Sequence, residues 1–315
     1  MAQISKIPIL SLCIPIYNRL SYLDAMLERF LEDKELFSED IHLYISDNCS
    51  DDDLCSCCDK YQDMGLKMEY HRNETNIGPD GNFQACFNHA IGKYVWLLGS
   101  DDIPTKGLLR ILIAQLKKDD YGLVHLSMKG ENRETEIFND PNKVAIAVSY
   151  MFTFMSANII LRESLKNIDL SKYERTYLIQ VPAYINACFA TKVNAVIFNE
   201  HVFEPGADLA NNGGFNFFLV FVENFYSIVF DFVNKGLLKM WAYDKIKEVE
   251  YKYYLLPAIY NIITRRTPNY ILKGCHTIML KHYWRCPYAY VYPFIKFVSF
   301  SKKNLKYLFH KRWGF

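Results

Sequence analysis

Residues 94–102 read Tyr-Val-Trp-Leu-Leu-Gly-Ser-Asp-Asp, and no other stretch constrains the fold as strongly. Five consecutive apolar residues are typical of a strand that is buried on both faces, as at the centre of a parallel sheet. The run stops at Gly99 and is followed by two adjacent carboxylates, Asp101 and Asp102. Because a buried carboxylate without a partner is costly, a pair of them at the end of a central strand indicates a function rather than packing.

Two interpretations of this carboxylate pair remain open at this point. Ligands of open α/β sheets bind at the carboxyl ends of the strands, and Mg²⁺ is commonly held by one or two carboxylates together with substrate phosphates. Asp101 and Asp102 would then hold Mg²⁺ or Mn²⁺ on a diphosphate. Alternatively, the two carboxylates cap a helix that begins near Thr105, where free N–H groups also attract negative charge.

The distribution of charge divides the chain into an acidic body and a basic end. The formal net charge is +1, but residues 251–315 contain 12 Lys or Arg, 17 Tyr, Phe or Trp, and no Asp or Glu. The first 250 residues therefore hold 24 basic and 35 acidic side chains. Such a basic and aromatic end suits the surface of an anionic membrane, a solvated helical subdomain or a single-stranded nucleic acid. No RNA-binding signature accompanies it, so the membrane surface is favoured and no nucleic-acid partner is expected.

The nine cysteines favour reduced thiols in a cytosolic protein, since no secretory signal peptide precedes them. Four of them, Cys49, Cys55, Cys57 and Cys58, lie close enough in sequence to raise a zinc hypothesis. Their spacing lacks the paired arms of structural zinc sites, so ordinary thiols are the better interpretation. No run of about 18 uncharged apolar residues occurs, and a membrane-spanning helix is not expected.

The first part of the chain alternates predicted strands with predicted amphipathic helices. The predicted strands are 9–16, 41–46, 67–71, 94–98 and 123–127. Several of these strands end in a polar turn, which is the βαβ pattern of a nucleotide-binding sheet. Ser21 is placed to cap the helix after the first strand, and Asp47 either contacts a nucleoside or shapes the turn with Ser50. Neither a dinucleotide-binding nor a Walker glycine pattern is present.

Four short motifs in order resemble family 2 glycosyltransferases, which have a GT-A fold. The motifs are Ile-Pro-Ile-Tyr-Asn-Arg at 14–19, Ser-Asp-Asn-Cys-Ser-Asp at 46–51, Asn-Ile-Gly at 76–78 with Asn82, and Leu-Gly-Ser-Asp-Asp at 98–102. The resemblance covers residues 9–127 well and extends more loosely to about 232. Residues 211–218, with the aromatic helix behind them, are similar to the branch that builds polysaccharide and O-antigen repeats.

The resemblance implies inverting, metal-assisted sugar transfer from a nucleotide-diphosphate sugar, with a UDP-sugar preferred, to an acceptor hydroxyl. It implies a donor site made from residues of all four motifs. The implied donor-binding residues are Pro15, Tyr17, Asn18, Arg19, Asp47, Asn76, Gly78 and Asp101. Asp102 would be catalytic by holding Mn²⁺ or Mg²⁺ on the diphosphate, with Asp101 beside it. A cation in that position stabilises the charge that develops on a departing diphosphate.

Two departures from the family pattern concern catalysis. Many relatives carry an acid where Gly99 stands, and relatives usually place an acidic pair where this chain has Gln180. Because an amide cannot act as a general base, another carboxylate or imidazole would be needed. The nearby candidates are Glu174, Asp208, Glu204 and His201, with Glu174 and Asp208 preferred; each of the four also suits a solvated or capping role.

The sequence therefore predicts an α/β fold of GT-A type, with a mixed and mainly parallel sheet flanked by helices and a helical basic and aromatic tail. We divide it into a donor-binding half at 1–127, an acceptor-binding half at 128–235 that begins with a polar hinge at 128–150, and the tail at 236–315. The expected protein is a cytoplasmic glycosyltransferase, peripheral on the inner face of the cell membrane, that acts on a lipid-linked glycan. The alternative is a sugar-nucleotide-binding or scaffold protein of a glycan-assembly complex that performs no catalysis.

Overall fold

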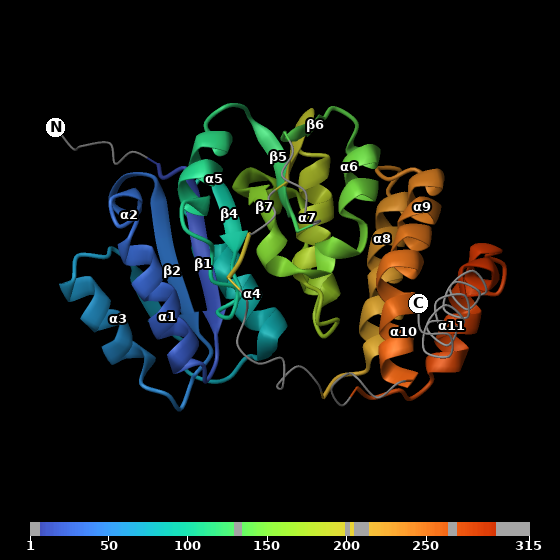
Figure 1. The fold of residues 1–315 in the computed structure, drawn as a ribbon, viewed down its shortest axis with the longest axis horizontal. Coiled ribbons are helices and arrows are strands. Elements are labelled where there is room, and N and C mark those ends of the chain that lie inside the picture. The colour runs from blue at the N-terminus through green and yellow to red at the C-terminus, as the bar shows by residue number, and fades with distance from the viewer. Residues whose placement is uncertain (1–6, 129–133, 199–201, 205–213, 264–269, 294–315) are drawn as a thin grey trace, which may run out of the picture.

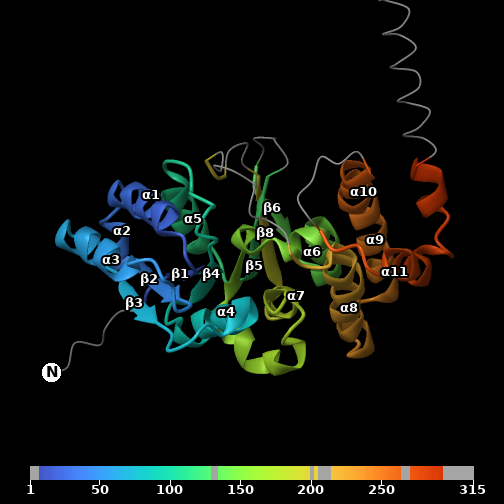
Figure 2. The same cartoon turned by 90° about the horizontal axis from the view of Figure 1, so that it is seen from below.

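The protein is described here by a computed structural model (Figure 1). The structure describes residues 7–128, 134–198, 202–204, 214–263 and 270–293. These residues form one large mixed sheet with helices on both faces and a group of helices at one end (Figures 1 and 2).

The sheet has eight strands in the order β3-β2-β1-β4-β7-β5-β8-β6. The strands are β1 (Leu10–Ile16), β2 (Ile41–Asp47), β3 (Glu69–Arg72), β4 (Tyr94–Leu97), β5 (Tyr121–Ser127), β6 (Glu136–Phe138), β7 (Asn158–Leu161) and β8 (Val193–Phe198). Strands β3, β2, β1 and β4 are mutually parallel, as are β5 and β8. The predicted α/β fold with a mixed, mainly parallel sheet is confirmed.

Burial on both faces explains the continuous apolar run of β4. Trp96 and Leu98 contribute to the core on one face of the sheet, whereas Val95 and Leu97 contribute to the core on the other. Strand side chains alternate between faces, so a central strand must be apolar at every position when helices cover both sides. Each large apolar side chain buried in this way contributes about 1.5–3 kcal/mol to folding.

Different helices cover the two faces (Figure 2). One face is covered by α1 (Leu20–Leu31), α3 (Leu54–Asp63) and α5 (Leu108–Leu116), with the short α2 (Leu36–Glu39) beside them. The other core contains apolar residues of α4 (Gly78–His89), α6 (Pro141–Val148) and α7 (Gln180–Cys188). Helix α4 begins at Gly78, the last residue of the Asn-Ile-Gly motif at 76–78, and has Pro79 in its first turn.

Strand β7 connects the two parallel parts of the sheet. It lies between β4 and β5 and is antiparallel to both. The segment at 128–150, expected to be a polar hinge, contains β6, which pairs with β8, and α6, whose Val144 and Val148 are buried. Because one sheet runs through residues 10–198, the division into a donor half and an acceptor half remains a prediction.

The C-terminal region is helical, as expected, and packs beside the sheet (Figure 1). It comprises α8 (Phe225–Asn234), α9 (Met240–Glu250), α10 (Leu256–Ile263) and α11 (Cys275–Tyr283), with π-helical turns at Leu219–Asn224 and Tyr251–Leu255. Phe225, Leu255 and Tyr283 are buried in the same core as α7. Within the described residues, every helix is too short or too polar to cross a membrane.

Candidate functional site

Asp101 and Asp102 follow the carboxyl end of β4, which pairs with β1 and β7 in the interior of the sheet. They do not cap the next helix, because α5 begins only at Leu108 and has no side-chain cap. The capping interpretation of this pair is therefore wrong. The two carboxylates stand at the strand edge where ligands of α/β sheets bind.

Asp102 is held in a partly buried position by Ser156. The Ser156 hydroxyl donates a hydrogen bond of 2.6 Å to Oδ2 of Asp102 and accepts one of 2.8 Å from the backbone N–H of Gly99. The indole N–H of Trp96 donates to the carbonyl of Ser156 at 2.8 Å, which fixes Ser156 against β4. Burial raises the pKa of Asp102 to about 6, and the Ser156 hydrogen bond opposes that rise.

Gly99 is required by the position of these carboxylates. A Cβ on residue 99 would lie 2.7 Å from Oδ2 of Asp102, 3.2 Å from Oδ1 of Asp101 and 3.2 Å from the Met155 side chain. Contacts of 2.7 Å are too short for a methyl group, so any larger side chain must displace Asp102. Glycine at position 99 therefore leaves the space in which the carboxylates of Asp101 and Asp102 lie against the end of β4.

Asp101 is paired with the first motif of the chain. Its Oδ2 lies 2.7 Å from Nη1 of Arg19, and the Arg19 guanidinium lies 5.5 Å from the centre of the Tyr22 ring. Arg19 immediately precedes α1, so this ion pair links the loop after β1 to the end of β4. Among the described residues, no group of three or more His, Cys, Asp or Glu could hold a metal ion. Metal sites that Mg²⁺ forms together with substrate phosphates commonly contain one or two protein carboxylates.

Asp47 ends β2 and is fully buried. Its Oδ1 accepts hydrogen bonds from the backbone N–H and the hydroxyl of Ser50, at 2.9 and 2.5 Å. Its Oδ2 accepts from the Tyr70 hydroxyl at 2.7 Å and from Arg72 at 3.0 Å. The turn-forming role with Ser50 is thus present, and contact between Asp47 and a nucleoside stays a prediction.

Asparagines connect the other motifs to the ends of β1 and β2. Asn18, whose φ is 51°, accepts from the N–H of Asp51 at 2.7 Å. Asn76 accepts from the Gly78 N–H and from the side chain of Asn48, both at 2.9 Å. Pro15 pairs with Ser46 near the end of β1, beyond the last residue paired with β4. Tyr17 is 43% exposed beside them. The donor-binding residues predicted from the sequence therefore cluster at one edge of the sheet.

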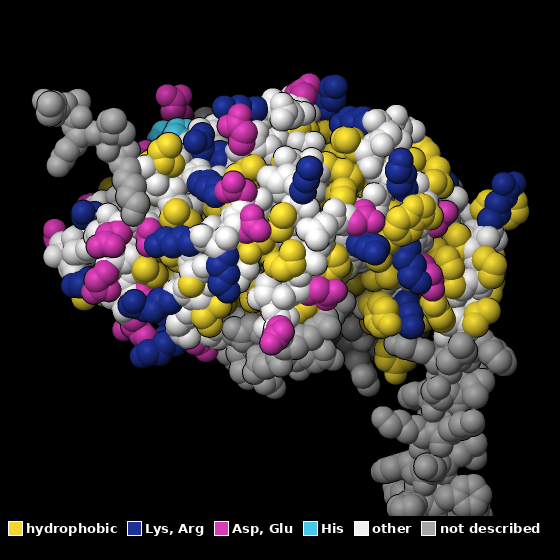
Figure 3. All heavy atoms as spheres, turned by 90° about the horizontal axis from the view of Figure 1, so that it is seen from above, with side chains coloured by type: hydrophobic (Ala, Val, Ile, Leu, Met, Phe, Trp, Pro, Cys, Tyr) yellow, Lys and Arg dark blue, Asp and Glu magenta, His cyan; other side chains and the backbone are white. Residues whose placement is uncertain are grey.

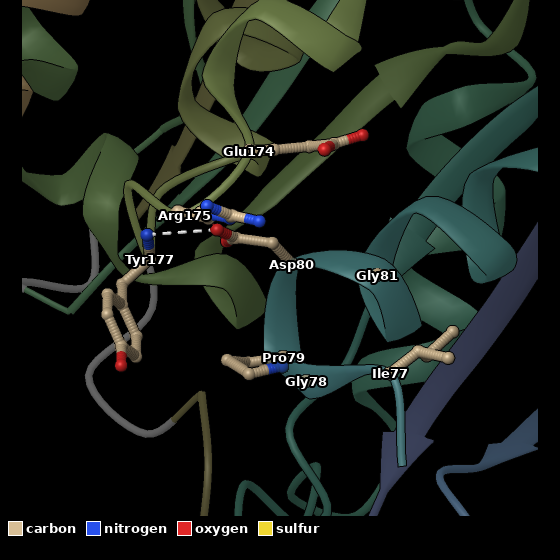
Figure 4. Close-up of a pocket in the computed structure, with 8 residues that line it drawn as sticks. All are labelled: Ile77, Gly78, Pro79, Asp80, Gly81, Glu174, Arg175 and Tyr177. Atoms are coloured by element: carbon tan, nitrogen blue, oxygen red, sulfur yellow. Dashed lines mark hydrogen bonds between the residues drawn. The ribbon is translucent and has the colours of Figure 1, made fainter. Parts of the chain in front are cut away.

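A cavity of about 400 Å³ separates the start of α4 from the loop before α7 (Figure 4). It is lined by Ile77, Gly78, Pro79, Asp80, Gly81, Glu174, Arg175 and Tyr177. Asp80 accepts from the N–H groups of Tyr177, at 3.1 Å, and Ile179, at 3.4 Å. Arg175 and Tyr177 have φ values of 63° and 62°, a region that non-glycine residues rarely adopt and that is often found at functional sites. The exposed Glu174 carboxylate therefore lines a shaped cavity.

The other candidates for a general base occupy different places. Gln180 begins α7 and is buried; its amide N–H donates to the Thr153 carbonyl at 3.2 Å, while Oε1 has no hydrogen-bond partner among the described residues. Glu204 pairs with Arg29 at 3.0 Å and thereby joins α1 to the segment after β8. Asp208 and His201 lie outside the described residues. Of the two preferred candidates, the structure places Glu174 alone.

The cysteine cluster does not form a metal site among the described residues. Cys57 and Cys58 are buried on α3, Cys55 is exposed, and Cys49 is half-buried with a φ of 64°. Burial raises the pKa of the Cys57 thiol to about 11 and that of Cys58 to about 12. The thiols of Cys57 and Cys58 are therefore protonated at neutral pH, and the interpretation of the four residues as ordinary cysteines stays a prediction.

Three parts of the site carry no signal in the sequence. Ser156, which holds Asp102, lies 54 residues away in a short 3₁₀ turn (Met155–Ala157). Arg72, which pairs with Asp47, directly follows the predicted strand 67–71 and is the last residue of β3. Asp80 occurs in a Gly-Pro-Asp-Gly stretch that is typical of an ordinary turn.

The fold and the strand-end carboxylates define a GT-A-type α/β protein. Two solved structures have the same fold. A structure of S. aureus TarS residues 1–349 matches with a TM-score of 0.57 and 16% identity over 78% of this chain and 72% of that one. Mannosyltransferase PcManGT from Pyrobaculum calidifontis, solved with GDP-Man and Mn²⁺, matches with a TM-score of 0.51 and 12% identity over 83% of this chain and 80% of that one.

Sequence comparison then gives the family. The glycosyl transferase family 2 profile matches residues 11–196, more than half of the chain, so the chain belongs to glycosyl transferase family 2. Abequosyltransferase RfbV of Salmonella typhimurium is 33% identical over 184 residues, which are 51% of this chain and 55% of that protein. The match thus spans about half the length of this relative.

Proposed function

We propose that this protein transfers a sugar from a nucleotide-diphosphate sugar to an acceptor hydroxyl with inversion. The observation that carries the proposal is the end of β4, where Ser156 donates a hydrogen bond to the partly buried carboxylate of Asp102, next to Asp101. A stable fold gains nothing from placing two carboxylates side by side at the edge where ligands bind. Family membership supports the same reaction.

The donor would lie against the ends of β1, β2 and β4. In this proposal Pro15, Tyr17, Asn18 and Asp47 line the nucleoside, with Arg19, Asn76, Gly78 and Asp101 around them. A UDP-sugar is the proposed donor; S. aureus TarS, which shares the fold, has been solved in complex with UDP, with a TM-score of 0.53 and 19% identity over 78% of this chain and 72% of that one.

A divalent cation, Mn²⁺ or Mg²⁺, fits the pair of carboxylates. Asp102 and Asp101 would hold it, and their oxygens are the ligands that these ions prefer. The fit is supported by the electrostatics of Asp102, since burial is the main cause that raises the pKa of its carboxyl to about 6, and a nearby cation would favour the ionised form. When bound, the ion would neutralise charge on the diphosphate leaving group. Arg19 would add a fixed positive charge beside Asp101.

The acceptor would enter from the side of the cavity between α4 and the loop before α7. Glu174 lines that cavity and is the proposed general base among the described residues. Asp208 remains a candidate outside the described residues. The proposed acceptor is a lipid-linked glycan of polysaccharide or O-antigen synthesis.

We place the protein on the cytoplasmic face of the cell membrane through its C-terminal helices. The 12 basic and 17 aromatic residues of 251–315, without a single acid, suit an anionic bilayer surface. Described aromatic residues of this region are exposed, among them Tyr253, Trp284 and Tyr290, and Trp241 of α9 is exposed as well. Aromatic side chains settle at the headgroup level of membranes.

The decisive test measures binding and turnover separately. Calorimetric titration of UDP, with and without Mn²⁺, should show metal-enhanced affinity in the wild type and none in Asp102→Asn. Asp63→Asn is the matched control, because Asp63 is an exposed carboxylate at the end of α3. Equal enhancement in the Asp102 variant would remove that residue from the site. A panel of nucleotide sugars with lipid-linked acceptors then tests transfer; donor binding without release of the nucleoside diphosphate would favour the scaffold alternative.

A further inference from the structure

A second cavity lies far from the strand-end site, in the C-terminal helices. Its volume is about 450 Å³, and it is formed by α9, the end of α11 and the turn that follows α11. The lining residues are Asp244, Lys247, Lys281, His282, Trp284, Arg285, Cys286, Pro287 and Tyr288. Three of them, Lys247, Lys281 and Arg285, are cations.

Lys247 is a buried cation with unused donors. It is only 9% exposed, and its ammonium group donates to the carbonyl of His282 at 2.8 Å. The rings of Tyr226, Tyr243 and Tyr283 surround it at 5.4–5.5 Å from their centres. An ammonium group has three N–H donors, and within the described part of the chain Lys247 has no carboxylate in an ion pair. Because a buried ammonium group without an ion-pair partner is costly, an anion bound beside Lys247 would stabilise it.

The other cations of the cavity differ in their partners. The Arg285 guanidinium is exposed and lies 4.3 Å from the centre of the Trp284 ring, with no ion pair to a described acid. Lys281 and His282 both pair with Glu223 of the π-helical turn before α8. Arg285 and Lys247 are therefore the two cations available to a ligand.

Two carboxyl groups oppose this positive charge. Asp244 lines the cavity and is exposed to solvent. Glu250 lies one turn along α9 from Lys247 and is fully buried. Burial raises the pKa of Glu250 well above its ordinary value, which favours its neutral form, and burial also lowers the pKa of Lys247. The lining of the cavity itself contains the cations Lys247, Lys281 and Arg285 and the carboxylate of Asp244, so positive side chains outnumber negative ones.

Exposed apolar side chains lie next to Trp284, which lines the cavity. Leu280 and Trp284 lie one turn apart, at the end of α11 and just after it, and are 60% and 55% exposed. The Tyr290 hydroxyl donates to the Trp284 carbonyl at 3.1 Å, which places this third exposed side chain beside them. Figure 3 shows hydrophobic and basic side chains intermixed over this end of the molecule. Large aromatic side chains next to cations are typical of segments that lie in a membrane interface.

We propose that this cavity binds the phosphate group of an anionic lipid headgroup. Arg285 and Lys247 donate hydrogen bonds to the phosphate oxygens, while Leu280, Trp284 and Tyr290 contact the acyl boundary around it. A nucleic acid would use the cations but leaves the aliphatic Leu280 without a role, so the lipid is the better match. This inference rests on the proposed membrane location and adds a specific headgroup site to it.

The test uses the full chain, because Tyr283 of α11 is buried in the core and a chain without α11 would uncover the Tyr226 ring, which packs against His282 and Tyr283. Vesicles of phosphatidylcholine, alone or mixed with phosphatidic acid or phosphatidylglycerol, are sedimented with the wild type, Arg285→Gln and Lys273→Gln. Lys273 is an exposed cation of the same region outside the cavity, so both variants lose one charge. Lys247→Met is a further variant, and its melting temperature reports whether it folds.

The expected result is binding of the wild type to anionic but not to neutral vesicles. Arg285→Gln should bind at least about tenfold more weakly, the fold-change of a lost hydrogen bond to a charged group, and Lys273→Gln within about threefold of the wild type. Equal losses in the two variants would mean diffuse electrostatics and overturn the site while leaving the membrane location standing. Absence of wild-type binding overturns both.

Two further arms separate other ligands. Inorganic phosphate or diphosphate that raises the melting temperature of the wild type but not of Arg285→Gln, without vesicle binding, would make the ligand a soluble phosphate and overturn the lipid assignment. The lipid assignment would also be overturned if the wild type bound single-stranded RNA more strongly than anionic vesicles and Arg285→Gln lost that RNA binding. Nucleotide binding at the strand-end site, measured in parallel, should be unchanged in every variant and reports on the proposed transfer reaction independently.

Discussion

Ser156 donates a hydrogen bond of 2.6 Å to the carboxylate of Asp102, across 54 residues of sequence. The same hydroxyl accepts the N–H of Gly99, so one side chain connects the residue that ends the β4 run to the carboxylate three positions later. Asp102 has one oxygen engaged in this way, and its burial would otherwise favour the protonated form. Ser156 therefore keeps Asp102 oriented and more readily ionised.

Ser156→Ala removes the one hydroxyl that supports Asp102 and should weaken metal-dependent binding of UDP by about tenfold, the usual scale for a hydrogen bond to a charged group. Calorimetric titration with Mn²⁺ checks it. Ser164→Ala is the matched control, because that buried hydroxyl donates only to the Leu161 carbonyl. Unchanged affinity in Ser156→Ala would show that Asp102 is oriented without its hydroxyl partner.

Asp102→Asn should stabilise the protein without ligand at high pH. The pKa of Asp102 is about 6 in the folded state, against an ordinary value of 3.8. The folded state therefore binds the proton of Asp102 more tightly than the unfolded state does. The contribution of this protonation to the free energy of unfolding is fully present below about pH 4 and is lost as the pH rises through about 6. Asparagine carries no charge, so Asp102→Asn avoids the cost of burying one at pH 8. Because one pKa unit corresponds to about 1.36 kcal/mol, its free energy of unfolding should exceed that of the wild type by at most about 3 kcal/mol.

Thermal unfolding of both proteins at pH 4.5 and pH 8, with a chelator present, measures this gain. The melting temperature of Asp102→Asn should exceed that of the wild type at pH 8, with a much smaller difference at pH 4.5. Asp63→Asn should show no such dependence, because Asp63 is exposed. A gain of equal size at both pH values would contradict the assignment of the effect to the carboxyl charge.

Local pattern was sufficient to predict the sheet and the placement of the motifs. The apolar run at 94–98 predicted a central strand, and β4 has neighbours on both sides and is buried at every position. The family resemblance implied one donor site made from residues of all four motifs. The ion pair between Arg19 and Asp101 connects the motif after β1 to the motif at the end of β4, while donor binding there stays a prediction.

Contacts between distant segments could not be predicted from local pattern. Ser21 was expected to cap α1, but the cap comes from Asp52, whose carboxylate accepts from the Leu20 N–H at 3.0 Å. Gly99 was interpreted as a departure from the family pattern, and the structure shows that a Cβ there would contact Asp102. Both outcomes depend on how a later segment folds back, which hydropathy and spacing do not encode.

The predicted role of Asp47 in donor binding is tested by comparing it with Arg72. Asp47→Ala leaves Tyr70, Ser50 and Arg72 without their acceptor, so we expect a loss of stability of about 2 kcal/mol or more. Donor affinity should fall by more than about 1 kcal/mol. Arg72→Gln should cost less stability, because Arg72 is 46% exposed.

Calorimetry with UDP and thermal melting separate the outcomes for these two variants. A large loss of affinity in Arg72→Gln would mean that Asp47 acts by positioning Arg72. Normal affinity in Asp47→Ala, measured where the variant is folded, would reduce Asp47 to a turn-forming residue.

Asp80 couples the start of α4 to the loop that leads into α7. Its carboxylate accepts the N–H groups of Tyr177 and Ile179, whose loop is held with positive φ at Arg175 and Tyr177 (Figure 4). Asp80→Ala leaves two backbone donors without their acceptor and should lower stability by about 2 kcal/mol, since a buried donor without a partner costs about 1–3 kcal/mol. Asp80→Asn keeps an acceptor oxygen in the same place and should lose much less stability.

The same substitution should also affect the acceptor. In Asp80→Ala the loosened loop should raise the KM for the acceptor, because Glu174 and the cavity share that loop, while UDP affinity stays within about threefold. Urea unfolding and steady-state kinetics measure the two effects. Equal stability of the alanine and asparagine variants would mean that these hydrogen bonds contribute nothing, and a loss of UDP affinity without a change in acceptor KM would assign Asp80 to the donor site instead.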